Sequence, residues 1–255
     1  MNIFLTFAYL FFIGSVLGWV LELFFRRFFS SANPERKWIN PGFCVGPYLP
    51  LYGTGLCVLY TLAKLGTDIG FMDSWWEKLI LLLIMAVSMT LVEFIAGLIA
   101  LKWLKVRYWD YRNQWGNVMG LICPKFSLAW GLVCALYLYL IHPNVLEALK
   151  WLSENLAFSF VIGLFFGVFT VDAVHSAQLV ARIRAFAKEE KVVVVYESLK
   201  AYIKSAEDRL HSKTNFFKPF SEKLRSLPEY MRELVEKEKT RIKDIRGKDK
   251  KENVN

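Results

Sequence analysis

The amino-acid sequence predicts an all-α, polytopic membrane protein with about five transmembrane helices and a helical cytoplasmic tail. Of its 255 residues, 55% are hydrophobic and 16% aromatic, more than a soluble domain usually contains. The apolar runs lie within residues 1–176, whereas residues 177–255 hold 20 Lys and Arg against 13 Asp and Glu, and thus +7 of the net charge of +9. We therefore predict a transmembrane domain at 1–176 and a basic, amphipathic helical tail at 177–255.

Five stretches have the apolar length of about 20 residues that a bilayer span needs. They cover residues 3–25, 47–65, 78–101, 119–141 and 156–176. The first has no basic leader and ends in Phe-Phe-Arg-Arg, so we interpret it as a retained helix and not as a signal peptide. Lys and Arg gather after the first and third spans, which predicts an outside N-terminus and a cytoplasmic C-terminus.

The second and fourth spans begin with helix-breaking residues. The stretch 40–55 contains Gly42, Gly46, Pro47, Pro50 and Gly53 and no charge. Because Pro lacks an N–H and Gly permits positive φ, this stretch cannot begin as a regular helix. Broken backbone at membrane depth is tolerated only inside protein or beside a wet cavity. Two interpretations follow. The stretch could bind a solute through its free backbone groups, or it could form a turn that caps the helix and binds nothing.

Charged residues occur within four of the predicted spans. Glu22, Glu93, Lys125 and Asp172 would each be costly in lipid, so such residues usually face a cavity or a partner. As alternatives, Glu22 could pair with Arg26 one turn later, and Lys125 could extend to the head groups. Glu93 has no basic neighbour nearby on its own helix and is the strongest candidate.

The loop after the third span contains a second polar group. Asp110 is flanked there by Trp109 and Tyr111. This trio would form either an aromatic-walled binding site at the cytoplasmic mouth or an ordinary interfacial aromatic belt with local ion pairs.

The first two spans resemble the next two. In the first pair, Glu22 precedes a basic loop and Asn40; in the second, Glu93 precedes a basic loop and Asn117. Pro47 lies seven positions after Asn40 and Pro124 lies seven positions after Asn117, and an aromatic–Gly pair comes next in both, Tyr52–Gly53 and Trp130–Gly131. This pattern predicts a parallel repeat about an axis along the membrane normal.

These same motifs resemble the ABC-transporter type IV family of bacterial integral membrane proteins. The resemblance covers about residues 1–175 and rests on motifs that occur in the family's order. The matching positions are Gly18, Trp19, Glu22, Asn40, Gly42, Phe43, Gly46, Pro47, Pro50, Tyr52, Gly53, Glu93, Gly97, Trp109, Asp110, Tyr111, Asn117 and Gly120, with Asp172 also similar. The chain departs at Lys125, near which the family often has an acidic residue. The resemblance implies a polytopic membrane protein with a cytoplasm-facing cluster, and it favours transport.

We therefore predict a permease-like protein, such as the membrane subunit of a transporter, with a cytoplasm-facing cavity lined by carboxylates and broken-helix backbone. Its expected substrate-binding residues are Glu22, Asn40, Tyr52, Glu93, Trp109, Asp110, Tyr111, Asn117, Lys125 and Asp172. The expected partners are membrane lipids and a separate ATPase subunit or a second copy of the chain, because five spans are too few for a complete two-fold pathway. The alternatives are a membrane-embedded enzyme acting on a lipid or isoprenoid-linked substrate, and a scaffold acting through its tail.

Several other functions are not indicated by the sequence. The four Cys form no C-x-x-C pair, and no phosphate-binding loop or nucleophile motif is present, so no cofactor, metal site or catalytic group is expected. Acidic residues interleave with the basic ones in the tail, which disfavours nucleic acid as a partner.

Overall fold

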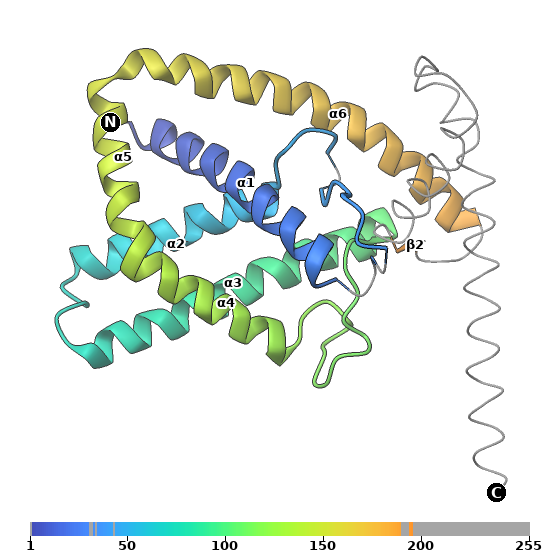
Figure 1. Ribbon diagram of the computed structural model, residues 1–255, viewed down its shortest axis with the longest axis horizontal. Coiled ribbons are helices and arrows are strands. Elements are labelled where there is room, and N and C mark those ends of the chain that lie inside the picture. The colour runs from blue at the N-terminus through green and yellow to red at the C-terminus, as the bar shows by residue number, and fades with distance from the viewer. Residues whose placement is uncertain (1, 31–32, 34, 43, 190–193, 196–255) are drawn as a thin grey trace, which may run out of the picture.

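The computed structural model describes residues 2–30, 33, 35–42, 44–189 and 194–195, and it confirms an all-α architecture (Figure 1). The described residues contain one two-stranded sheet, in which β1 pairs with β2 in parallel. The elements are α1 (Ile3–Phe28), α2 (Pro50–Asp68), α3 (Trp75–Ile99), β1 (Val106–Arg107), α4 (Pro124–Leu136), α5 (His142–Glu154), α6 (Ser159–Glu189) and β2 (Val194–Val195).

Within the described residues, four helical stretches are long and apolar enough to cross a membrane. The span predicted at residues 47–65 corresponds to α2. This helix is not among the four, because Thr, Gly and Lys residues lower its hydropathy. The four stretches are Ile3–Phe28, Trp75–Leu104, Pro124–Glu154 and Leu156–Ala177.

Proline and positive φ angles set the helix boundaries. α2 and α4 begin at Pro50 and Pro124, a few residues later than the predicted spans, because a helix accepts Pro in its first turn but not further in. Before α4, Met119 and Gly120 have φ angles of 55° and 67°, which no right-handed helix contains. Beyond α4, a π-helical turn at Tyr137–Ile141 leads into α5, which runs toward the start of α6 (Figure 1).

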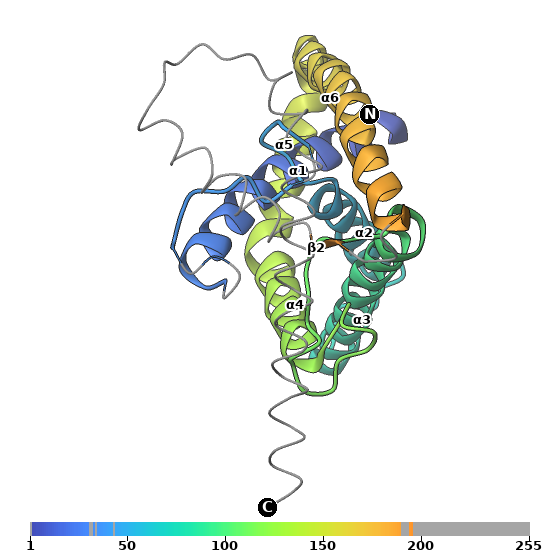
Figure 2. The same cartoon turned by 90° about the vertical axis from the view of Figure 1, so that its right-hand side faces the viewer.

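The helices pack in sequential pairs, α1 with α2 and α3 with α4, and α2 and α3 join the pairs (Figure 2). Glycines allow the closest approach, between α1 and α2. A Cβ at Gly18 would lie 2.1 Å from the Cβ of Tyr52, and a Cβ at Gly53 would lie 2.3 Å from Ser15 Oγ. Small residues at helix interfaces in membranes serve this purpose. The core between α2, α3 and α4 includes the buried side chains of Met85 and Cys134.

α6 lies at the edge of this bundle. Of the most apolar part of Leu156–Ala177, 6% is buried inside the protein, against 22–33% for the other three stretches. It docks on α1 through aromatic pairs, with ring centroids 4.6 Å apart for Phe12–Phe165 and 5.8 Å apart for Phe11–Phe166.

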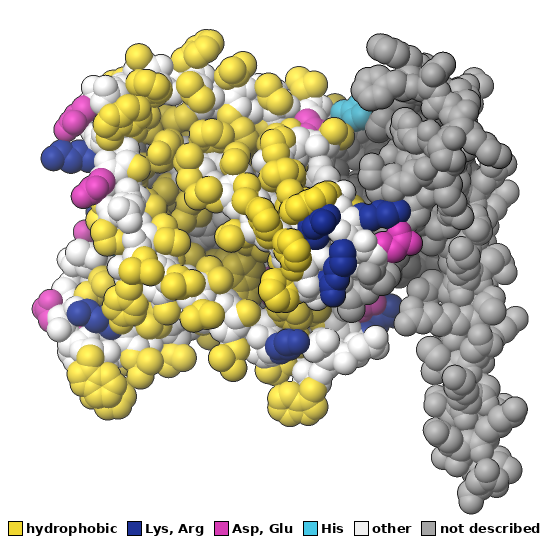
Figure 3. Space-filling view, in the orientation of Figure 1, with side chains coloured by type: hydrophobic (Ala, Val, Ile, Leu, Met, Phe, Trp, Pro, Cys, Tyr) yellow, Lys and Arg dark blue, Asp and Glu magenta, His cyan; other side chains and the backbone are white. Residues whose placement is uncertain are grey.

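The loops after α1 and α3 meet at the end of the molecule opposite the N-terminus (Figure 1). Figure 3 shows a group of Lys and Arg side chains at that end, beside an apolar middle. The side of the membrane that each end faces stays a prediction. α6 continues past the predicted boundary at 176 to Glu189, and the rest of the predicted tail lies outside the described residues, apart from β2.

Candidate functional site

Glu22 on α1 accepts hydrogen bonds from two side chains. Arg26 Nε donates to Oε1 at 2.9 Å, so the ion pair considered from the sequence is present. The hydroxyl of Tyr52 on α2 donates to Oε2 at 2.8 Å. The missing side chain at Gly18, one turn earlier on α1, leaves the space in which Tyr52 approaches.

Glu93 on α3 is more deeply buried, with 5% of its surface exposed. Tyr111 Oη donates to Oε1 and Trp130 Nε1 donates to Oε2, both at 3.0 Å. The Tyr111 ring stacks on Phe126, with centroids 4.4 Å apart. Both donors are neutral, and among the described residues no cation forms an ion pair with Glu93, in contrast to Glu22.

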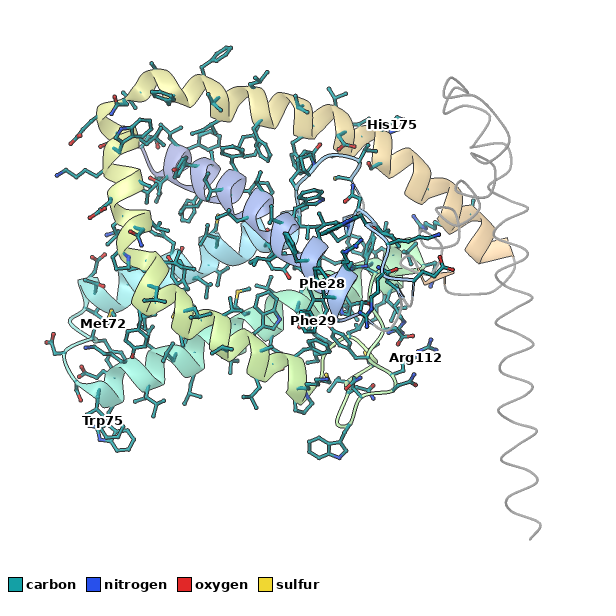
Figure 4. All side chains as sticks on the ribbon, in the orientation of Figure 1. Phe28, Phe29, Met72, Trp75, Arg112 and His175 are labelled. Carbon is teal, nitrogen blue, oxygen red and sulfur yellow. The ribbon has the colours of Figure 1, made fainter. Side chains whose placement is uncertain are left out.

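The two acids belong to one continuous cluster. The rings of Tyr52 and Trp130 lie 5.7 Å apart and join the two pairs of helices. Each of these rings belongs to the aromatic–Gly pair that the internal repeat aligns, and each donates to the Glu of its own helix pair. We call Glu22, Tyr52, Glu93, Tyr111 and Trp130 the acid cluster. Figure 4 shows how densely side chains fill the region between Phe28 and Arg112.

Asn40 and Asn117 hold the loops that precede α2 and α4. Asn40 Oδ1 accepts from Trp19 Nε1 at 3.0 Å and from the N–H of Gly42 at 3.1 Å. Asn117 Oδ1 accepts from the N–H of Gly120 at 3.0 Å. Both side-chain amides also donate to backbone carbonyls of their own loops. These two predicted binding residues therefore shape the loops, as Asn commonly does in turns.

Asp172 on α6 binds backbone N–H groups that are left free in the irregular stretch before α2. Its carboxylate accepts from the N–H of Val45 at 3.1 Å, from the N–H of Gly46 at 2.7 Å and from the Tyr48 hydroxyl. Ser176 Oγ adds a fourth hydrogen bond at 3.0 Å. The helix break thus binds a group of this chain's own last helix.

The loop after α3 is tied together by its polar side chains. Arg112 Nη2 contacts Asp110 Oδ2 at 2.6 Å. Burial raises the pKa of Asp110, but the hydrogen bonds and charge of Arg112, with a smaller effect of Arg107, outweigh it and leave the pKa below its usual value. Trp109 Nε1 donates to the Leu121 carbonyl at 2.8 Å, next to Gly97. Trp109 and Asp110 therefore fix the loop beside the acid cluster.

Lys125, at the start of α4, is exposed, and its Nζ lies 5.8 Å from the centroid of the Phe126 ring.

Two hollows lie outside the acid cluster. One of about 330 Å³ lies between α3 and α4 and is lined by Thr90, Phe94 and Ser127 among others. The other, of about 1030 Å³, follows α6. Neither is lined by Glu22 or Glu93. In the described part of the chain no His, Cys, Asp and Glu side chains group to hold a metal ion, and the four cysteines are free thiols.

Two important donors were not among the predicted site residues. Trp130 appeared in the repeat as the counterpart of Tyr52, and that alignment could have predicted its bond to Glu93. Tyr48 lies between two motif prolines, and no sequence signal linked it to Asp172, which is 124 residues away.

The comparisons with known proteins agree with this architecture. No curated protein and no solved structure matches the chain. A family profile described as "Putative ABC-transporter type IV" matches residues 9–177, which run from within α1 to Ala177 in α6 and include every residue of the acid cluster. Four membrane-length apolar helices and this family both point to a membrane location. Because the match covers more than half of the sequence, the chain belongs to the family that this profile describes.

Proposed function

We propose that the protein is a permease-like membrane transport protein that binds a cationic group of its solute at the acid cluster. The observation that carries this proposal is Glu93, which is almost fully buried and is held by two neutral donors. A carboxylate inside a membrane protein usually faces a partner or a transport route. Glu22 already has Arg26 as its counter-ion, so Glu93 is the acid with capacity for a solute.

The solute would reach Glu93 through movement of the loop after α3. Tyr111 belongs to this loop and not to a helix, and it covers one oxygen of Glu93. A small displacement of the loop would uncover that oxygen without separating helices. With Tyr111 displaced, the freed oxygen of Glu93 would accept a charge-assisted hydrogen bond from an ammonium group of the solute.

We expect the chain in the bacterial cell membrane, with the N-terminus outside and the C-terminus in the cytoplasm. The support is the gathering of Lys and Arg in the loops at 26–40 and 102–117. These loops would receive an ATPase subunit. That subunit would be a separate chain, because the sequence contains no phosphate-binding loop of its own. In the absence of such a subunit, a second copy of the chain would complete the pathway.

The test is affinity purification of the full-length protein in mild detergent, followed by mass spectrometry of the proteins and small molecules that remain bound. Wild type would be compared with Glu93→Gln and with Glu147→Gln, an exposed acid on α5 that serves as the control. We expect an ATPase subunit with all three proteins, and a retained cationic solute with wild type and the control only. A wild-type preparation with neither an ATPase nor a solute, or equal solute retention by Glu93→Gln, would refute the proposal.

A further inference from the structure

α6 has one docked side and one open side. Phe165, Phe166 and Phe169 pack toward α1 and Tyr48. On the open side, a Cβ added at Gly163 or Gly167 would meet no atom within 4 Å. These two glycines form a notch in the surface of an otherwise bulky apolar helix.

A groove of about 1030 Å³ runs along this open side. Its lining is apolar from Phe160 through Leu164 and Val168 to Val171, and it becomes polar only at one end, at Asp172 and His175. Figure 3 shows the apolar surface of α6 reaching a histidine, which Figure 4 labels as His175. The groove therefore has the polarity of an amphiphile, with a long apolar part and a short polar end.

The polar end carries a negative charge that no cation of the described residues pairs with. Both oxygens of Asp172 accept from backbone N–H groups, and its other two partners are hydroxyls, so all four are neutral. These hydrogen bonds hold the carboxylate in place at the rim of the groove. A positively charged head group would complement it.

The length of the groove fits one leaflet of a bilayer. From Phe160 to Val171 an α-helix rises about 16 Å, at about 1.5 Å per residue. Half of the hydrocarbon thickness of a bilayer is about 15 Å. An occupant with its head at Asp172 and its chain beside Gly163 and Gly167 therefore spans one leaflet, which is the dimension of a single lipid and not of a transmembrane helix.

We propose that this groove is a binding site for a membrane lipid with an ammonium head group, such as phosphatidylethanolamine. The ammonium group lies beside the Asp172 carboxylate as its counter-ion, and one hydrocarbon chain lies in the notch at Gly163 and Gly167. The site is separate from the acid cluster and does not depend on transport.

The test uses the full-length protein purified from membranes that contain equal amounts of phosphatidylethanolamine and phosphatidylglycerol. Native mass spectrometry then measures which lipid remains bound. We expect wild type to be enriched in phosphatidylethanolamine by roughly fivefold, the effect of one partly exposed charge pair. Asp172→Asn removes the charge and should abolish the enrichment, and Gly167→Leu should do so by filling the notch. Glu147→Gln, away from the groove, should keep it.

Gly167→Leu makes the test decisive even if Asp172→Asn disturbs the loop at Val45 and Gly46. It leaves every hydrogen bond of Asp172 intact, and its Cβ enters open space. Equal binding of the two lipids by wild type, a preference for phosphatidylglycerol, or an unchanged preference in Gly167→Leu would overturn the proposal. The proposal would also be overturned if the protein formed a stable dimer that Gly167→Leu separates while the bound lipid stays the same.

Discussion

Replacing Gly18 with Ala should separate α1 from α2 and detach Tyr52 from Glu22. The added Cβ would lie 2.1 Å from Tyr52 Cβ and 2.2 Å from Tyr52 Cγ. Non-bonded carbon atoms rest at about 3.5–4.0 Å, so the two helices must move apart by roughly 1.4 Å at this crossing. The obstacle is the root of the side chain next to its backbone, which no change of rotamer can remove.

The expected cost combines two effects. Forcing an additional methyl group into a packed interface costs about 1–3 kcal/mol. The separation also stretches the 2.8 Å hydrogen bond from Tyr52 to Glu22 beyond bonding distance, and a hydrogen bond to a charged group contributes about 1.5–3 kcal/mol. We therefore expect a loss of roughly 3–5 kcal/mol, which for a chain of this size lowers the apparent Tm by about 10 °C.

The assay is thermal unfolding of the full-length protein in mild detergent. Gly163→Ala is the matched control, because it adds the same methyl group to a helix at a position with nothing within 4 Å. The control should melt at the wild-type temperature or slightly above it, since Ala favours helix more than Gly does. If Gly18→Ala melted together with Gly163→Ala, the close α1–α2 contact would not exist as described.

Three further outcomes are expected. Tyr52→Phe keeps the ring but loses the hydrogen bond to Glu22, so its apparent Tm should fall by a few degrees and by less than that of Gly18→Ala. Gly120→Ala should lower it as well, because position 120 has a φ of 67° and a Cβ there would lie 2.6 Å from Arg112 Cγ; unchanged melting would contradict the loop geometry. Asp110 has a lower pKa in the folded protein than in the unfolded chain, so its ionised form stabilises the fold. This contribution to the free energy of unfolding is complete above the unfolded pKa of about 3.9 and disappears as pH falls through the folded pKa. Wild type should therefore melt above Asp110→Asn at pH 7 and approach it near pH 3, and a constant difference would exclude this origin.

Hydropathy alone predicted most of the fold. Runs of apolar residues gave the positions of α1, α2, α3, α4 and α6 but not of α5, and Lys and Arg predicted that the loops after α1 and α3 lie at one end. The internal repeat and the family motifs placed Tyr52 among the candidate site residues, but its hydrogen bond to Glu22 was not predicted. The starts of α2 and α4 were predicted a few residues early, because hydropathy counts Pro50, Pro124 and their neighbours as apolar and ignores their backbone limits.

Contacts between distant segments could not be predicted. Asp172 was identified as an unusual charge in a membrane segment, but its binding to Val45 and Gly46 joins parts of the chain more than 120 residues apart. A single sequence does not contain the register of α6 against that loop. Ligand contact by Asn40 and Asn117 stays a prediction, and the sequence did not show that their amide groups bond to their own loops.

The placement of the donors to Glu22 and Glu93 has a consequence for biogenesis. Each acid receives a hydrogen bond from the helix that follows it in the chain, Tyr52 for Glu22 and Trp130 for Glu93. A carboxylate on a single helix resists partitioning from the translocon into lipid, whereas a helical hairpin can enter with that group already bonded. Each pair would thus be inserted as a unit during translation, and loss of Tyr52 or Trp130 would first reduce the yield of integrated protein.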